Sequence, residues 1–492
     1  MYLYDDIKKI NFCENYYLLS QQNLAHENLK LRKDYDIYDL IIAKLKITDF
    51  FIGDFNTTNE ELITQLNSKK YVLRAFFQYR NIKVEVPCIK RVNNGIDVYF
   101  VSYLLYPKLE HSKEWKYAIS VLKKFNLHIN NVYAIYINGD YVYKNKIDPS
   151  EALLISRNFH NNKKKQLKKI KSVVCNKLPD LDYISRKLKK SSSINSIEKK
   201  DCCEHKMKCV YSERCTTSID LQEDDSILTL TLSKNKTKMY RDGILLLKDA
   251  DLDLVEGSKA QYAQIMASKN GGLFINYYAL KGLFDQLQYP LIFVDFEWDI
   301  FPLPIYDGMK PFETIVFQYS IHILHENGEV KHHEYLNEKD CREDLLINLL
   351  NDIPKVGTIL SFGATGAECL RLKELAKQFN GYSKQIDDIL NRIKDFILPF
   401  TDGVVYHIKM RGQYSLKALM SIMENDGGYD ELEIKQGADA VLKWRSFSME
   451  EDSSEKVKIK EQLLKYCAMD TYSMVVIYKW LNRKLEKWLK GF

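Results

Sequence analysis

The chain has 492 residues, of which 46% are hydrophobic and 28% charged, and its net charge is +6. It is too long for one ordinary core, so two or three domains are expected, and the composition excludes a disordered or fibrous protein. No run of about 18 apolar residues and no signal-peptide pattern is present, so we expect a cytoplasmic protein. Its 10 cysteines then indicate metal binding or packing rather than disulfides.

The first stretch, residues 1–160, mixes strand-like and helix-like segments. KVEVPCIKRV and GIDVYFVSYLLY predict two paired strands joined at Asn93-Asn94-Gly95. EWKYAISVLKKFNL has helical spacing, and NVYAIYINGDYVY predicts a second hairpin that turns at Asn138-Gly139-Asp140.

The second stretch, residues 161–225, is basic, then serine-rich, then cysteine-rich. Residues 161–200 hold 13 Lys and Arg against 3 Asp and Glu. The run NNKKKQLKKIK offers a contact for nucleic-acid phosphates, and a solvated helix face is the alternative interpretation. A connecting region, residues 226–285, follows.

The third stretch, residues 286–492, alternates strand and helix signals, which favours an α/β domain with a central sheet. The predicted strands are LIFVDFEW, TIVFQYSIHIL and GTILSF. The predicted helices are EDLLINLLNDI, ECLRLKELAKQF and a long terminal helix from about Val457.

Two carboxylates interrupt the first of these strands. Asp295 and Glu297 are two residues apart, so on a strand they leave the sheet side by side on one face. Buried like charges need a positive counter-charge, and Mg²⁺ or Mn²⁺ prefers such hard oxygen ligands. An edge strand with both acids in water is the alternative for these two residues alone.

Further acids lie on separate predicted elements. Tyr466 and Asp470 are four residues apart on the terminal helix and share one face. Glu368 starts a helix, where complementing the helix dipole is its alternative role, and Asp395 is a further candidate. Four acids from separate elements suit two-metal phosphoryl chemistry, with the ions about 3.5–4 Å apart.

The order D-x-E, a mid-chain acid at a helix start, and Y-x-x-x-D resembles the DnaQ-like family of 3′–5′ exonucleases. The resemblance implies an RNase H-like fold in which Tyr466 positions the attacking water. It implies four metal ligands: Asp295, Glu297, Glu368 and Asp470. Residues 364–368 depart from the family, since they read Ala-Thr-Gly-Ala-Glu where the family has Asn, a spacer and Phe-Asp. Asp395 then becomes a candidate fourth ligand, although an acid there more often supports the ligands in related proteins.

Longer motifs carry a second resemblance that covers most of the chain. Four of them are similar, in order and spacing, to a bacterial family of largely uncharacterised proteins that end in a DnaQ-like domain: YPLIFVDFEWDIFPLPIYDGMKPFETIVFQYSIHIL, RGQYSLKALM, ELEIKQGADA and LLKYCAMDTYSM. Members begin with a RecB-type nuclease module, of the kind found in CRISPR-associated nucleases, that carries an iron–sulphur cluster. The resemblance implies a restriction-endonuclease-like fold over residues 1–225 and an exonuclease domain over residues 286–492.

The same resemblance assigns a cysteine cluster, formed by Cys13, Cys203, Cys209 and Cys215. Four thiolates suit a [4Fe–4S] cluster, and zinc is the alternative metal. The neighbouring Cys202 leaves the choice of ligands open. Four unbound thiols are the remaining alternative.

The nuclease residues of the RecB-type module are missing. The family needs an Asp, a Glu-x-Lys and a Gln, but this chain has no acid at Pro87 or Cys88, none in residues 98–106, and Ala118 in place of the Gln. Without carboxylates the module lacks a site for an activating metal, so we expect a degenerate, catalytically inactive nuclease fold.

These observations predict a hydrolase, a Mg²⁺- or Mn²⁺-dependent 3′–5′ exonuclease that acts on DNA or RNA and has its site in residues 286–492. The alternative is a catalytically inert nucleic-acid-binding or assembly protein built from two nuclease folds. A redox-responsive factor built around the cysteines is a third interpretation. No membrane partner is expected.

Overall fold

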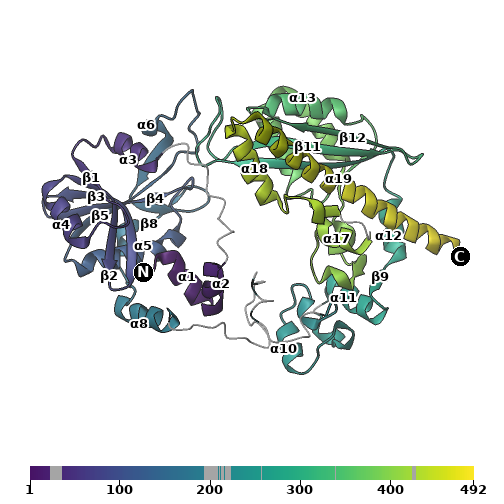
Figure 1. Cartoon of the computed structure of the whole chain (residues 1–492), viewed down its shortest axis with the longest axis horizontal. Helices are drawn as coiled ribbons and strands as arrows, with labels where there is room; N and C mark the ends of the chain where they lie inside the picture. The colour runs from purple at the N-terminus through teal and green to yellow at the C-terminus, as the bar shows by residue number, and fades with distance from the viewer. Residues whose placement is uncertain are drawn as a thin grey trace. The chain divides into compact units, whose positions relative to one another are not determined.

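The computed structural model describes residues 1–22, 36–192, 209, 211, 215, 223–255, 257–337, 339–423 and 428–491 (Figure 1). The chain forms two compact units. The first contains Met1–Glu198 and Phe301–Glu313, and the second contains Lys199–Ile300 and Thr314–Phe492. Both units combine helices with a mixed sheet. Among the described helices, none is both long enough and apolar enough to span a membrane.

The first unit is built on a six-stranded sheet of order β1-β2-β3-β4-β5-β6. The pairs β1/β2 and β4/β5 are parallel and the other neighbours are antiparallel. Both faces are covered, because alternate residues of β2 enter different cores, Val72 one and Leu73 the other. The strands are β1 (Phe50–Ile52), β2 (Tyr71–Tyr79), β3 (Ile82–Val92), β4 (Gly95–Ser102), β5 (Ile129–Ile137) and β6 (Leu153–Ser156).

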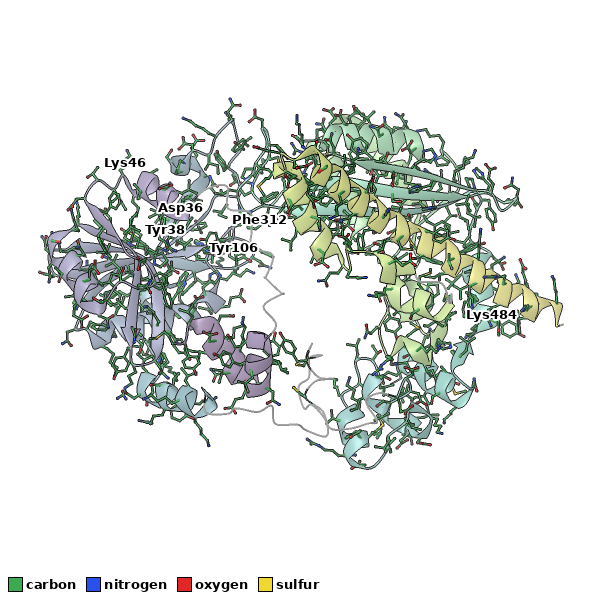
Figure 2. The ribbon with its side chains drawn as sticks, in the orientation of Figure 1. Asp36, Tyr38, Lys46, Tyr106, Phe312 and Lys484 are labelled. Atoms are coloured by element: carbon green, nitrogen blue, oxygen red, sulfur yellow. The ribbon has the colours of Figure 1, made fainter. Side chains whose placement is uncertain are left out.

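Helices cover this sheet, and local sequence fixes where several of them begin. The Asp36 carboxylate accepts a hydrogen bond of 2.9 Å from the Tyr38 backbone N–H at the start of α3, where both residues are labelled (Figure 2). The helices are α1 (Tyr4–Phe12), α2 (Glu14–Gln22), α3 (Ile37–Leu45), α4 (Asn59–Ser68), α5 (Ser112–Lys124), α6 (Pro149–Ala152), α7 (Ile170–Val174) and α8 (Leu181–Ser192).

Of the two hairpins predicted in this unit, one is confirmed and one is wrong. β3 and β4 are antiparallel with Val92 opposite Gly95, as expected, and the predicted helix is α5. Gly95 has φ of 138°, and a Cβ there would lie 2.1 Å from the His128 carbonyl oxygen, so the turn requires glycine. β5 does not pair with residues 141–143, because β4 and β6 occupy its two edges.

The lysine-rich run, residues 161–171, contains the turn and second strand of a small hairpin. β7 (Asn158–His160) and β8 (Gln166–Lys169) are antiparallel and form a small separate sheet. The alternative interpretation of this run as a helix face is therefore wrong. A tertiary pairing with β7, which lies before the run, overrides its helix-compatible composition.

The second unit is built on a five-stranded sheet of order β12-β11-β10-β13-β14. β11 is antiparallel to both neighbours, and β13 and β14 continue parallel to β10. The strands are β10 (Leu291–Ile300), β11 (Thr314–Leu324), β12 (Val330–Leu336), β13 (Thr358–Ser361) and β14 (Ile393–Asp395). A separate ladder pairs β9 (Leu273–Ile275) with β15 (Val405–His407).

The helices of this unit include those of the predicted connecting region, residues 226–285. That region packs into the second unit; for example, the Gln264 amide donates a 3.0 Å hydrogen bond to the Tyr406 hydroxyl. The helices are α10 (Lys236–Arg241), α11 (Lys259–Lys269), α12 (Tyr277–Phe284), α13 (Arg342–Asp352), α14 (Glu368–Gln378), α15 (Ser383–Arg392), α16 (Leu398–Thr401), α17 (Leu416–Met423), α18 (Gly437–Met449) and α19 (Ser453–Lys490).

Two apolar cores lie on opposite faces of the five-stranded sheet. α19 lies along one face and α13 along the other (Figure 1). β10 alternates between them, so that Leu291 and Phe293 enter the core with α19, whereas Ile292 and Val294 enter the core with α13. The next odd-numbered residues of β10 are Asp295 and Glu297, so the acids continue the α19 face.

The segment between β10 and β11 belongs to the first unit. Leu303 is buried in the same core as residues of β2 and β4, and Phe312, which is labelled in Figure 2, packs against that core. The Tyr143 backbone N–H donates to the Met309 carbonyl at 2.9 Å, which continues the attachment along the segment. The chain therefore passes between the units three times.

Candidate metal centre

Three carboxylates converge between the central strand and the long terminal helix. Asp295 and Glu297 of β10 and Asp470 of α19 each offer an oxygen, and these oxygens lie within 4.8 Å of one another. Glu297 and Asp470 are buried and Asp295 is half-buried. No other group of three or more potential ligands of this kind occurs among the described residues.

The cluster is electrostatically unfavourable without a cation. Burial raises the pKa of Asp295 well above its usual range, and the carboxylates of Asp470, Glu368 and Glu297 raise it further. Burial likewise raises the pKa of Glu297, followed by the charges of Asp470 and Glu368. Like charges held together in this way favour protonation or binding of a cation.

Asp470 is held by two tyrosines. Burial raises its pKa to about 6, although hydrogen bonds from Tyr429 and Tyr466 lower it. Burial and the nearby acids raise the pKa of the Tyr466 hydroxyl, so this hydroxyl keeps its proton at neutral pH and acts as a donor. The thiol of Cys467 lies 3.5 Å from Asp295 Oδ2 and donates a hydrogen bond to the Asp295 carboxylate.

Glu368 lies beside the three carboxylates, at the first residue of α14. Its carboxylate accepts a hydrogen bond from the Ser361 hydroxyl at the end of β13. Burial raises its pKa to about 7. Since its charge raises the pKa of both Asp295 and Glu297, it belongs to the same electrostatic cluster. Its place in the first turn also fits the helix-dipole alternative.

Asp395 forms hydrogen bonds with the backbone of the loop that precedes Glu368. Its carboxylate accepts backbone hydrogen bonds from Gly363 at 2.8 Å, Thr365 at 3.3 Å and Ile397 at 3.2 Å. These bonds engage both oxygens and hold the loop that leads to Glu368. This arrangement fits a residue that positions Glu368.

A second set of polar contacts fixes α19 on β11. The Thr471 hydroxyl lies 2.7 Å from the Ser320 hydroxyl and 2.8 Å from His322 Nδ1. The Gln318 amide donates to the Leu463 carbonyl at 2.8 Å. These bonds set the register of α19 and so place Asp470 opposite β10.

A buried ion pair fixes α18 next to the carboxylates. Asp299 accepts two hydrogen bonds of 2.8 Å from Arg445 Nε and Nη2. Because the pair attaches α18 to β10, Gly437 at the start of α18 lies close to Glu297. A Cβ added at Gly437 would lie 3.7 Å from the Oε2 atom of Glu297. No sequence signal indicates this partner, although the D-x-E-x-D alternation puts Asp299 on the face of the other acids.

We expect Arg445→Gln to destabilise the second unit by about 3–5 kcal/mol, because it leaves the Asp299 carboxylate buried without its cation. Thermal and urea unfolding measure the loss. The double variant Asp299→Leu, Arg445→Leu is the control and should recover most of the stability. Equal losses in the single and double variants would contradict the role given to the pair.

The donor set fits a hard divalent cation. It consists of carboxylate oxygens only, and burial raises the pKa of each member, while repulsion from neighbouring acids raises those of Asp295 and Glu297 further. Mg²⁺ and Mn²⁺ prefer such ligands. Asp295, Glu297 and Asp470 are the residues placed to hold an ion, and Glu368 is next to them.

The predicted cysteine cluster lies partly outside the described residues. Cys203 lies outside them, as does the neighbouring Cys202. Cys13 belongs to α1–α2 of the first unit, whereas Cys209 and Cys215 belong to the second. The iron–sulphur or zinc site stays a prediction.

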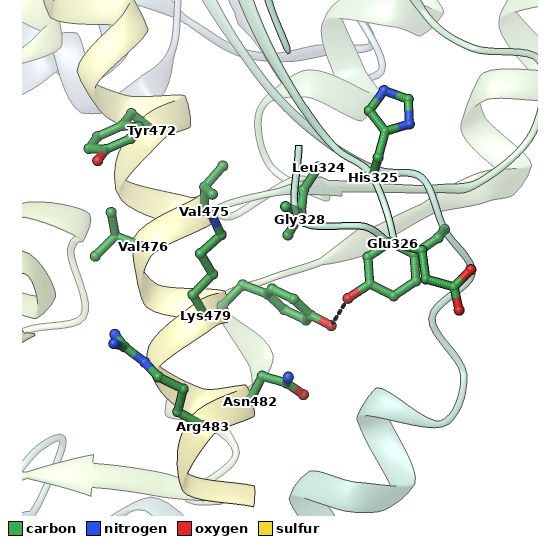
Figure 3. A pocket seen from close by; sticks show the side chains of 12 residues that line it. Leu324, His325, Glu326, Gly328, Tyr472, Val475, Val476, Lys479, Asn482 and Arg483 are labelled. Atoms are coloured by element: carbon green, nitrogen blue, oxygen red, sulfur yellow. Dashed lines mark hydrogen bonds between the residues drawn. The ribbon is translucent and has the colours of Figure 1, made fainter. Parts of the chain in front are cut away.

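A separate cavity of about 470 Å³ lies on another side of α19 (Figure 3). None of the four clustered acids lines it. Its wall combines the outer side of α19 with the turn between β11 and β12, and includes Tyr472, Val475, Lys479, Arg483, His325 and Glu326. The carboxylates and this cavity are therefore distinct features of the second unit.

Part of the chain is similar to a known protein family. Residues 292–415 match the family described as a domain of unknown function (DUF2779), which amounts to 124 of the 492 residues. The match begins in β10 and ends before α19, so it includes Asp295, Glu297 and Glu368 but not Asp470. No curated protein and no solved structure matches the chain.

Proposed function

We propose that the second unit is a metal-dependent nuclease, a 3′–5′ exonuclease with an RNase H-like fold, that hydrolyses phosphodiester bonds in DNA or RNA. The observation that carries this proposal is the convergence of Asp295, Glu297 and Asp470 on one buried point. A mixed five-stranded sheet with the acids on its central strand also supports it. The 3′–5′ direction rests on the resemblance to DnaQ-like exonucleases alone.

In this proposal Asp295, Glu297, Asp470 and Glu368 hold Mg²⁺ or Mn²⁺. Two bound ions would supply activation of the attacking water and stabilisation of the leaving oxygen. Tyr466, whose hydroxyl keeps its proton and donates it in a hydrogen bond to Asp470, orients the water by accepting a hydrogen bond from it. Asp395 holds the loop before Glu368, and Tyr429 fixes the Asp470 carboxylate.

For the first unit we propose a degenerate RecB-type fold without nuclease activity of its own. The positions where the family has its acids lie on β3 and β4, and here Cys88 is buried and apolar in its surroundings. Burial raises the pKa of its thiol, so it offers no ligand for a hard cation.

The test is degradation of labelled single-stranded DNA and RNA with Mn²⁺, comparing the full-length protein with Asp295→Ala. We expect stepwise loss from the 3′ end that the variant abolishes. Asp387→Ala, which removes an exposed acid from α15, is the matched control and should retain activity. Cleavage of neither polymer by folded protein would favour the inert nucleic-acid-binding alternative.

A further inference from the structure

The most strongly charged segment of the described chain is the one that forms the β7–β8 hairpin. Residues 157–171, called here the lysine hairpin, contain Arg157 and no acidic residue. Its lysines are Lys163, Lys164, Lys165, Lys168, Lys169 and Lys171. The proposed nuclease chemistry uses none of these residues.

The turn of the lysine hairpin is rigidly built. Asn161 closes the turn through its backbone and its side chain. Its backbone N–H donates to the Lys165 carbonyl at 3.0 Å. Its side-chain oxygen accepts from the backbone N–H groups of Lys163 at 3.0 Å and Lys165 at 2.9 Å. Lys164 adopts φ of 57°, in the left-handed region. Three consecutive lysines are thus held in one defined conformation, although their mutual repulsion opposes it.

The two ends of the hairpin are anchored in the core. Phe159 is buried and stacks on Trp115 of α5, with ring centroids 5.6 Å apart. Ile170, which follows β8, is also buried. All four residues of β8 between these anchors are exposed, so the fold presents this strand to solvent.

Most of the cations on the hairpin have no counter-charge within the described chain. Lys164 lies 3.6 Å from the exposed Asp140 carboxylate, and Lys171 donates to the Asn130 carbonyl. The remaining four lysines have no ion-pair partner among the described residues: Lys163, Lys165, Lys168 and Lys169. Exposed cations on a hydrogen-bonded turn, most of them without a counter-charge, fit a polyanion.

We infer that the lysine hairpin binds the phosphate backbone of nucleic acid without regard to base sequence. This inference rests on the proposed function, since it supplies the nucleic-acid contact that a nuclease site in the second unit needs. Lysines bind phosphates as point charges and lack the bidentate geometry that reads bases. Leu167 is the one exposed large apolar side chain on the hairpin, which disfavours an anionic membrane surface as the partner.

The test uses the full-length protein in EDTA, so that binding is measured without cleavage. Fluorescence anisotropy with labelled single-stranded DNA and RNA gives the affinity from about 50 to about 200 mM salt. The variant carries Lys163→Gln, Lys165→Gln, Lys168→Gln and Lys169→Gln. The control variant removes the same charge from exposed helical lysines, with Lys8→Gln, Lys113→Gln, Lys123→Gln and Lys377→Gln.

For the hairpin variant we expect a shallower salt dependence, measured as the slope of log K against log salt. The slope should fall by up to about 0.7 for each phosphate that the protein no longer neutralises. The control should keep the wild-type slope. Equal slopes for both variants would overturn the inference, as would wild-type protein that binds neither polymer. Hairpin-dependent binding to phosphatidylglycerol vesicles but not to nucleic acid would also overturn it.

These outcomes are separate from those of the cleavage assay. Hairpin-dependent binding by a protein that never cleaves would support the inference and contradict the proposed exonuclease. Cleavage that persists with unchanged salt dependence in the hairpin variant would support the exonuclease and overturn the inference.

Discussion

Asp470→Asn should abolish the proposed nuclease activity, by about 10³-fold or more, and leave the protein folded. The asparagine keeps an oxygen that can accept the hydrogen bonds of Tyr429 and Tyr466, but it removes the charge that would hold a cation. Loss of one essential electrostatic group lowers kcat on this scale. The measurement is the initial rate of nucleotide release with saturating Mn²⁺.

The stability of the same variant separates chemistry from folding. Without metal, Asp470 is a buried carboxylate whose pKa is raised from 3.8 to about 6. Removing its charge should therefore leave the melting temperature at neutral pH unchanged or higher. Asp387→Asn is the control for both measurements. Full activity in Asp470→Asn would show that the centre is wrongly assigned.

Mn²⁺ should raise the melting temperature of the wild-type protein, and the rise should grow between about pH 5 and about pH 8. Metal must displace protons from the carboxylates, so affinity increases as they ionise. An ion at one hundred times its Kd stabilises the folded state by about 2.7 kcal/mol. The measurement is thermal unfolding with and without Mn²⁺ at each pH, at matched ionic strength.

The metal-free protein should behave in the opposite way. The pKa values of Asp470 and Glu368 in the folded state are about 6 and about 7, whereas carboxyls in the unfolded chain titrate near about 4. Between these values the folded state binds more protons than the unfolded state, so stability falls as the pH rises. Asp470→Asn should weaken both trends. An equal Mn²⁺ effect at the two ends of the pH range would contradict the assignment.

Local periodicity accounts for what the sequence predicted about this centre. The two-residue repeat of a strand places Asp295 and Glu297 on one face, and the four-residue spacing of a helix places Tyr466 beside Asp470. Both rules act within a few residues, so they hold whatever the tertiary fold. The α/β character of the second unit follows from the same alternation of patterns.

The features that the sequence did not predict depend on distant pairings. Tyr429 reaches Asp470 across 41 positions, and Arg445 reaches Asp299 across 146. Asp395 accepts hydrogen bonds from Gly363 and Thr365, about 30 residues away, and no sequence signal indicates these partners. The second predicted hairpin is wrong for a related reason, since β4 and β6 compete for the edges of β5.

The attachment of Phe301–Glu313 to the first unit has a consequence for dissecting the protein. A fragment that starts at residue 286 keeps β10 and β11 but carries a connecting segment whose apolar residues, Leu303 and Phe312, have lost the core that buries them. Such a fragment exposes new hydrophobic surface beside the strand of Asp295 and Glu297. Excising the second unit cleanly therefore requires a short polar linker in place of residues 301–313.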